Sequence, residues 1–341
     1  MKSITQLTVV VISLLLLAAN CVSAELKVSA VELLPRLDLR AKAGQPIAET
    51  LRVQQAELGL RFSVGDGQKE WATFALQGVL ETPMTGRARQ MHFSNFYVVG
   101  NLGVDRPKVK AGQFVVPFGT LAEYDTHTLL LQTPYARTLG IRLERGLALE
   151  GFVGDWDYWL STTSGNGRNR HNGGYALSLR MARDWELGDD FVRVGSSYLE
   201  GKQMPTFPTN PMPVPMGMDE MVVFTDKRRL AVDVDWLRGI DNIRTELVLG
   251  QDNSNWVDGQ WLYYNHPFSY ETDVTLQADR WRQEDGTSYG LGTEIHHRLD
   301  DWSGLRLSYE HRSVHPKLAT SQSVDLVTLQ YYREYAWTID T

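Results

Sequence analysis

Histidine, serine and acidic side chains are the groups in this sequence that could form a hydrolytic site. The candidate histidines are His127, His171 and the adjacent pair His296 and His297. A Ser–His–acid triad depends on tertiary contacts that no sequence spacing supplies. Neighbouring residues of a strand point to opposite faces, so His296 and His297 cannot bind one metal ion together. The sequence also has no glycine-rich phosphate loop and no Cys–His metal spacing, so we expect no enzyme, no metal site and no cofactor.

Charged side chains recur at every second position of several apolar segments, and this pattern indicates a different chemistry. In VQQAELGLRFSVG, which begins at Val53, Glu57 and Arg61 alternate with apolar residues such as Leu58 and Leu60. The same period of two recurs in RLAVDVDW, NIRTELVLG, YALSLRM and GLRLSYEH. A period of two predicts β-strands that have one apolar face and one polar face.

A secretory signal peptide is predicted over residues 1–24. Lys2 is followed by the apolar run Val9–Ala19 and then by small residues that end at Ala24. The run is too short to be a transmembrane helix, which takes about 20 apolar residues. We therefore expect export of the chain and a single domain over residues 25–341.

Composition narrows the class of protein without choosing the fold. The formal net charge is −7, and no basic tail or patch opposes it, so we expect no nucleic-acid partner. The only cysteine, Cys21, lies within the predicted leader, so disulfides cannot hold the exported domain together. A lipoprotein anchor at Cys21 is the weaker alternative, because Asn20 precedes it where a small residue is usual.

The connections between the predicted strands alternate between short turns and longer loops. DGQKE, GDWD and GIDN are short, whereas SGNGRNRHNGG, the segment 202–228 and DNSNWVDGQ are longer. We predict an all-β fold, a transmembrane antiparallel β-barrel of about 16 strands with short periplasmic turns and long extracellular loops. Aromatic residues near strand ends, such as Trp236 and Trp281, favour the barrel over a soluble sandwich or propeller.

In a water-filled barrel the polar face of each strand must point into the lumen. A charge at the lipid midplane costs roughly 2–4 kcal/mol, whereas a charge in the lumen stays hydrated. The predicted pore-lining residues are Arg61, Lys108, Lys110, Arg142, Arg180, Asp233, Asp235 and Arg244. On the same grounds the polar face also includes Glu57, Glu144, Glu246, Arg306 and Glu310. A wall of mixed charge gives a modest ion preference, and any one of these residues could instead form a salt bridge that stiffens the wall.

The segment KVKAGQFVVPFG, residues 108–119, contains a conflict of alternation. Lys108 and Lys110 share their parity with Phe114 and Phe118, so charged and large apolar side chains would face the same side. Either Gly112 hosts a β-bulge that resets the alternation, or an apolar patch faces the lumen.

The long segment 120–140 follows the fifth predicted strand. Its apolar run Leu129–Leu131 has little reason to be exposed, so we predict that the segment folds into the barrel and packs on the inner wall. The alternative is a loop on the rim or in a trimer contact. Residues expected at the resulting constriction are Glu123, Asp125, His127 and Arg137.

The motifs KAGQFVVPFG, RGLALEG, WLSTTSGNGRN and YALSLR together resemble the phosphate-selective porin O and P family over roughly residues 109–183. The resemblance implies a trimeric outer-membrane porin of sixteen strands that passes small solutes, in some members anions such as phosphate. The acidic composition departs from the family, and its basic ladder has no residue-by-residue match in this chain. Phosphate selectivity is therefore the least supported part of the resemblance.

Taken together, these patterns predict a porin for passive diffusion of small solutes or ions in the outer membrane of a Gram-negative bacterium. The expected partners are outer-membrane lipid, the permeating solutes and two further copies in a homotrimer. Two alternatives stay open: a structural barrel that sheaths a partner protein, and an outer-membrane hydrolase with its active site at the rim.

Overall fold

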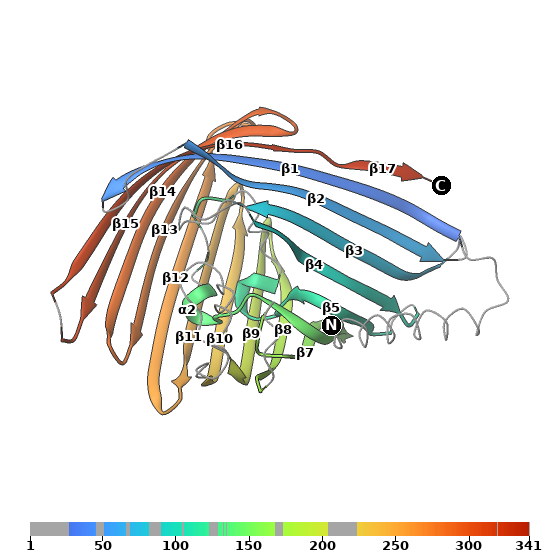
Figure 1. Cartoon of the computed structure of the whole chain (residues 1–341), viewed down its shortest axis with the longest axis horizontal. Helices are drawn as coiled ribbons and strands as arrows, with labels where there is room; N and C mark the ends of the chain where they lie inside the picture. The colour runs from blue at the N-terminus through green and yellow to red at the C-terminus, as the bar shows by residue number, and fades with distance from the viewer. Residues whose placement is uncertain are drawn as a thin grey trace.

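The computed structural model describes residues 27–45, 51–65, 69–81, 90–103, 106–122, 129–131, 133, 135–167, 173–203, 224–318 and 320–340. Strands make up most of these residues and curve into a single barrel (Figure 1). In this part of the chain, no helix is both long enough and apolar enough to cross a bilayer. The predicted signal peptide, residues 1–24, lies outside the described residues.

Seventeen strand segments form one antiparallel sheet within the described residues. The first nine are β1 (Lys27–Gln45), β2 (Leu51–Gly65), β3 (Glu70–Glu81), β4 (Gln90–Asn101), β5 (Lys108–Val115), β6 (Leu143–Val153), β7 (Trp156–Thr163), β8 (Tyr175–Leu187) and β9 (Asp190–Gln203). The others are β10 (Thr225–Arg238), β11 (Asp241–Asp252), β12 (Asn255–Pro267), β13 (Thr272–Gln283), β14 (Gly286–Asp300), β15 (Ser303–Pro316), β16 (Gln322–Glu334) and β17 (Trp337–Asp340).

The barrel closes because β1 pairs on both of its edges. One edge pairs with β2, and the other pairs first with β17 and then with β16. Since β16 and β17 are consecutive and share the same neighbour, they are two parts of one strand, and the described barrel has sixteen strands. The predicted fold class and strand number are therefore confirmed.

The two ends of the barrel differ in their connections. At one end, here called the turn end, the strands join through short segments such as 154–155, 188–189 and 301–302. At the other, the loop end, residues 116–142 and 204–224 separate consecutive strands. One predicted loop was wrong. In the segment DNSNWVDGQ only residues 253 and 254 form a tight turn, with Asn253 in a left-handed conformation at φ of 54°, and the rest belongs to strands β11 and β12.

The described strands bury polar side chains and expose apolar ones. In β8, Ser178 and Arg180 are buried, whereas the alternate residues Leu177, Leu179 and Met181 are exposed. A soluble sheet that packs on a core shows the opposite arrangement. Apolar residues exposed in the same way on other strands include Leu58, Leu76, Leu147, Leu230, Val232, Leu262, Leu291, Ile295, Leu307 and Leu329.

Strand β5 resolves the conflict of alternation in KVKAGQFVVPFG. Gly112 has a φ of 135°, yet its pairing with Tyr97 and Gly146 continues the ladders on both sides without a register shift. The alternation is therefore not reset. Phe114, together with Val116 and Phe118 beyond the strand, stays on the inward parity, and all three are at most 2% exposed. The second alternative holds, because an apolar patch faces the inside of the barrel.

Replacing Gly112 by alanine should destabilise the barrel by about 1–3 kcal/mol, the usual cost of a strained backbone conformation. A Cβ at this position would contact Phe96 O and lie 2.7 Å from Tyr97 Cα, and L-residues rarely adopt this φ. The measurement is the temperature at which the folded band is lost on heat-modifiability gels. Gly100→Ala is the matched control, because its Cβ would lie 3.8 Å from the nearest backbone atom. Equal losses in both variants would contradict the argument.

Candidate functional site

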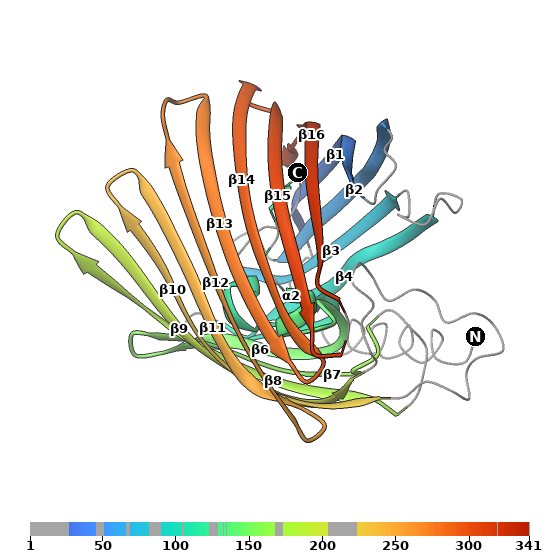
Figure 2. The ribbon, with the colours of Figure 1, turned by 90° about the vertical axis from the view of Figure 1, so that its left-hand side faces the viewer.

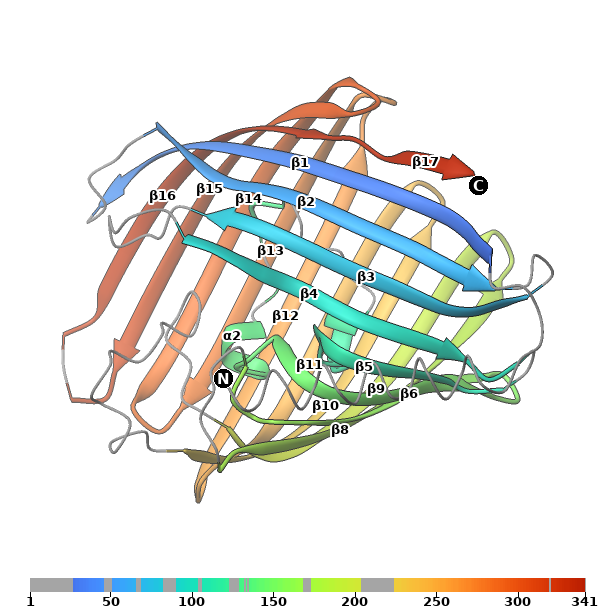
Figure 3. The same ribbon diagram turned by 45° about the vertical axis from the view of Figure 1, so that its right-hand side comes forward.

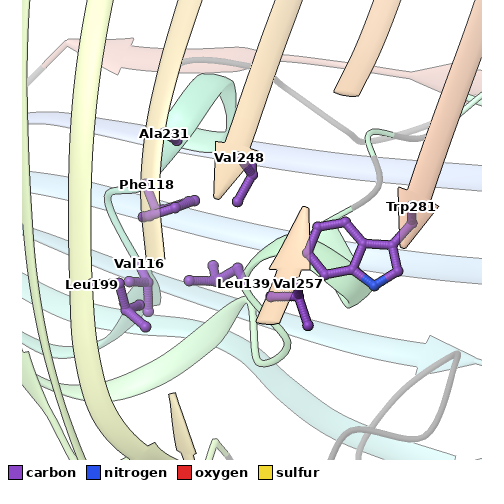
Figure 4. Close-up of a cluster of buried hydrophobic side chains, with 8 residues drawn as sticks. All are labelled: Val116, Phe118, Leu139, Leu199, Ala231, Val248, Val257 and Trp281. Carbon is purple, nitrogen blue, oxygen red and sulfur yellow. The ribbon is translucent and has the colours of Figure 1, made fainter. Parts of the chain in front are cut away.

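The described parts of the segment between β5 and β6 lie inside the barrel, enclosed by the strands (Figures 1 and 3). Val116, Phe118 and Leu139 of this inserted segment are at most 1% exposed. They form one apolar cluster with inward side chains of five consecutive strands (Figure 4). Those wall residues are Leu199 of β9, Ala231 of β10, Val248 of β11, Val257 of β12 and Trp281 of β13. The described parts of the segment therefore lie on the inner wall, as the sequence predicted.

Polar groups of the wall fix the start of the inserted segment. A short 3₁₀ helix, η1 (Gly119–Ala122), begins where the Gly119 amide donates a hydrogen bond to Ser197 Oγ at 2.9 Å. The amide and the hydroxyl of Thr120 both donate to Glu246 Oε2, at 3.0 and 3.1 Å. Because Glu246 is buried, these bonds satisfy a carboxylate that would otherwise be costly to enclose.

Two cations of β10 hold the end of the same segment. Helix α2 (Tyr135–Thr138) leaves carbonyl groups unsatisfied at its C-terminus. Arg229 Nε donates to Thr138 O at 3.0 Å, and Lys227 Nζ donates to Leu139 O at 3.1 Å. Positive charge at a helix C-terminus is favourable, so these bonds both cap α2 and anchor it to the wall.

The predicted contact of the leucine run with the inner wall is made by Leu131, on a strand beyond those of the apolar cluster. Leu131 is 3% exposed and packs on β14 at Gly292, where a Cβ would lie 2.7 Å from Leu131 Cδ2. The glycine thus makes room for the leucine. The inserted segment is consequently held from β9 to β14, and β1 to β5 form the opposite side of the ring (Figure 2).

The described residues 164–167 of a second connection also meet the inner wall. Glu144 is fully buried and accepts hydrogen bonds from the Gly167 amide at 3.3 Å and the Ser164 hydroxyl at 3.4 Å. Gly165 and Gly167 have φ near 60°, which lets the chain curl around the carboxylate. Glu144 therefore fixes this connection and is not exposed to solvent in the lumen.

Four of the predicted pore-lining residues form two ion pairs. Arg180 and Asp233 are both buried and form a two-pronged pair, with Arg180 Nη2 2.9 Å from Asp233 Oδ1. Arg244 Nε lies 2.9 Å from Asp235 Oδ2, and 36% of the Asp235 side chain is exposed. The first pair is thus sealed inside the wall, whereas the second reaches the lumen.

Three more predicted residues lie on β2 and β5 with part of the side chain exposed. Lys110 Nζ is 3.1 Å from Glu150 Oε2 and 5.2 Å from the centre of the Tyr97 ring. Lys108 lies two residues before Lys110 on the same face of β5 and is exposed. Arg61 Nη1 lies 3.8 Å from Glu32 Oε2, and 54% of the Arg61 side chain is exposed. All three cations keep access to solvent, and the carboxylates of Glu32 and Glu150 offset part of the charge of Arg61 and Lys110.

The remaining predicted residues lie at other kinds of position. Arg142 precedes β6 and places its guanidinium 5.7 Å from the centre of the Tyr135 ring, so it belongs to the inserted segment and not to a strand. Arg137 lies within α2, and the structure describes its backbone but not its side chain. Outside the described residues lie Glu123, Asp125, His127 and His171.

The histidine pair behaves as the strand geometry requires. His296 faces inward, where Nδ1 lies 2.8 Å from Asp273 Oδ2 and Nε2 lies 2.7 Å from Tyr332 Oη. His297 is exposed on the other face and contacts Thr272. Both ring nitrogens of His296 are thus occupied by groups other than serine. Among the described residues, no group of three or more His, Cys, Asp or Glu side chains is arranged to hold a metal ion.

Lys227 and Arg229 are anchors that the sequence analysis missed. They share the inward parity of Asp233 and Asp235 on β10. The predicted strand RLAVDVDW began at Arg229, so Lys227 lay outside it. Extending the alternation backwards by one residue pair would have placed both cations on the inner wall.

Removing the Glu246 carboxylate should release the inserted segment. In Glu246→Ala, two donors of Thr120 lose their buried acceptor, at a cost of about 1–3 kcal/mol. The expected result is faster proteolytic cleavage within residues 116–142 of the folded barrel. Glu294→Ala is the matched control, because Glu294 is an equally buried wall carboxylate that pairs with Arg306 on the neighbouring strand. Cleavage at the same rate in both variants would show that Glu246 does not anchor the segment.

Comparisons with known proteins agree on the fold. No family model matches the chain, and no curated protein matches it either. Solved structures do match. An anion-selective porin from Comamonas acidovorans has a TM-score of 0.64 at 13% identity, covering 91% of this chain and 100% of that one. The outer membrane channel DcaP of Acinetobacter baumannii has a TM-score of 0.63 at 12% identity, and the match covers 92% of this chain and 99% of that one. The trimer form of OmpT, an outer membrane protein of Vibrio cholerae, has a TM-score of 0.63 at 9% identity. The match covers 90% of this chain and 100% of that one. At such identities the likeness establishes the barrel fold alone, and it does not confirm the resemblance to the phosphate-selective porin O and P family.

Proposed function

We propose that this chain is an outer-membrane porin, a water-filled channel for passive diffusion of small solutes or ions. The observation that carries the proposal is the reversed distribution of side chains, polar within the closed barrel and apolar around it. A closed barrel satisfies every strand edge, which is the condition for a sheet to cross hydrocarbon. The similarity to an anion-selective porin and to an outer membrane channel supports the same function.

The outer surface has the layout that a bilayer requires. On β11 the outward side chains Ile243, Leu247 and Leu249 form part of an apolar band. Toward the turn end the band is bordered by aromatic residues, among them Trp156, Trp185, Trp236 and Tyr264. Toward the loop end it is bordered by polar residues, among them Arg228, Gln251, Gln260, Arg280 and Asp325. Aromatic and polar borders on either side of an apolar band are typical of transmembrane barrels.

The inserted segment gives the channel its constriction in this proposal. It is held against β9 to β14, so the permeation path lies between it and the opposite wall of β1 to β5. That wall carries Arg61, Lys108 and Lys110 with partly exposed side chains. Their position favours anions locally, and phosphate is one candidate solute. The carboxylates Glu32 and Glu150 beside them limit the preference.

Two alternative functions are distinguishable from a porin. A sheath for a partner protein would stay closed or noisy in a planar bilayer, whereas a porin opens ion-permeable steps by itself. A hydrolase at the rim would need a serine, a histidine and an acid in mutual contact. His296 contacts Asp273 and Tyr332, and His315 Nδ1 lies 2.9 Å from Ser321 Oγ near the loop end. Among the described residues the histidines paired with an acid are His266, His296 and His311, so the His315–Ser321 contact has no acid to complete a triad. A homotrimer, export through the predicted signal peptide and a Gram-negative outer membrane complete the proposal. The trimer form of the Vibrio cholerae protein is the support for the oligomeric state.

Reversing the charge of both lysines tests the channel and its preference together. In the double variant Lys108→Glu and Lys110→Glu, the reversal potential in a salt gradient should shift toward cations, most clearly at low ionic strength where screening is weak. The measurement is single-channel recording in planar bilayers. Lys202→Glu on the outer face of β9 is the control and should leave the reversal potential unchanged. A well-folded double variant with the parental reversal potential would refute the role of the lysines, and wild-type protein without channels would refute the porin.

A charge placed in the outer apolar band tests the membrane orientation. Leu247→Arg should destabilise the inserted barrel by roughly 2–4 kcal/mol, the cost of arginine near the bilayer midplane. Gln251→Arg is the matched control on the same face and strand, and at the border its cost should fall to about 0–1 kcal/mol. Urea unfolding in lipid vesicles measures both. Equal destabilisation would show that Leu247 does not face hydrocarbon.

A further inference from the structure

An ion cluster on the outer surface near the loop end is not used by the channel. Asp258 of β12 is only 9% exposed because two arginines of β13 cover it. Arg280 Nη1 donates to Asp258 Oδ2 at 2.9 Å, and Arg282 Nε donates to Asp258 Oδ1 at 2.5 Å. Two cations thus share one carboxylate, and the cluster keeps one unit of positive charge.

Strand pairing places this cluster outside the barrel. Residues directly opposite one another share a face, and Asp258 lies between Leu249 and Arg282 in register. Leu249 is 48% exposed, whereas its neighbour Val248 is buried in the cluster with the inserted segment. Asp258 and the arginines therefore face the same surroundings as the apolar band.

The surroundings of the cluster supply hydrogen-bond donors and apolar surface. Arg280 is paired in register with Tyr289, and Arg282 with Thr287, so two hydroxyl-bearing residues adjoin the guanidinium groups. Toward the middle of the barrel, the same face continues with the exposed leucines Leu262, Leu276 and Leu291. A cation pair above an apolar surface suits a molecule with an anionic head and hydrocarbon tails.

The unpaired charge distinguishes this cluster from other outward ion pairs. Arg228 faces Glu200 at 3.4 Å, and Arg183 faces Asp155 at 2.8 Å, so each of those arginines has its own carboxylate. A guanidinium has five N–H donors, and contact with Asp258 leaves most of them free for a second anion. Arginine forks match phosphate oxygens well, and such charge-assisted bonds are about twice as strong as neutral ones.

We propose that Arg280 and Arg282 bind the phosphate group of an acylated lipid whose chains lie along the neighbouring leucines. This inference rests on the proposed outer-membrane location. It commits to a lipid because the cluster borders the apolar band on the outside of the barrel, where the exposed leucines contact acyl chains favourably and add nothing to the binding of a free phosphate ion. Asp258 spaces the two guanidinium groups and lowers the affinity by its own negative charge.

The test compares lipid retention by the folded barrel. Wild-type protein, the double variant Arg280→Ala and Arg282→Ala, and the control Arg183→Ala are purified from nanodiscs that contain bisphosphorylated lipid A or its dephosphorylated form. Native mass spectrometry then counts the bound lipid. Retention of the phosphorylated form should fall roughly 10- to 30-fold in the double variant, as expected for two arginines near an anionic lipid, and stay unchanged in the control.

A second variant keeps the proposal testable if the double variant does not fold. Asp258→Asn removes the competing carboxylate, so retention of phosphorylated lipid should rise above that of the wild type. Equal retention of both lipid forms, displacement by excess inorganic phosphate, or no change in either variant would overturn the inference. Channel recordings on the same samples separate the two proposals, because wild-type channels without lipid retention refute only the lipid site.

Discussion

Closure of the sheet through β1 is the constraint on which the rest of the structure depends. Because β1 pairs with β2 on one edge and with β16 and β17 on the other, no strand among those described has an unpaired edge along the ring. Closure also divides the surface into an inside and an outside. Each strand then presents alternate residues to two different surroundings, so a period of two in the sequence becomes a polar interior and an apolar exterior.

The interior is too wide for wall side chains alone to fill, and the chain uses its own connections to fill part of it. Val116 and Phe118 continue the inward parity of β5 beyond the end of the strand, which turns the segment into the barrel at once. On the wall, small or apolar residues such as Ala231 pack against this segment, and buried charged residues such as Glu246 form hydrogen bonds with its backbone. Buried charge here stabilises the inserted backbone, since each group meets an amide or a carbonyl that lost its water.

Burial therefore separates the inward charges into two kinds with different roles. Arg180, Asp233 and Glu144 lie beneath or beside inserted segments and hold the wall and the connections together. Lys110 and Asp235 stay partly exposed on the inner face, where a permeating ion would meet them in the proposed channel. Alternation assigns both kinds to the same face, so parity alone cannot tell an anchor from a residue that acts on solutes.

The sequence by itself determined most of the strands and their two faces, because these depend on local alternation. For the segment after β5 it predicted an inward path from the apolar run but left a position on the rim or in a trimer contact open. For residues such as Ser178 and Leu179, the alternation along the strand alone assigns the inward or outward face, and no knowledge of a pairing partner is needed. The tertiary structure decided the partners. Glu246 accepts a hydrogen bond from Thr120 across a separation of 126 residues, and Asp258 accepts hydrogen bonds from two arginines of a neighbouring strand. Such contacts follow from the register between strands and from the path of the inserted segment, which are set by the closed ring as a whole and leave no periodic signal in the chain.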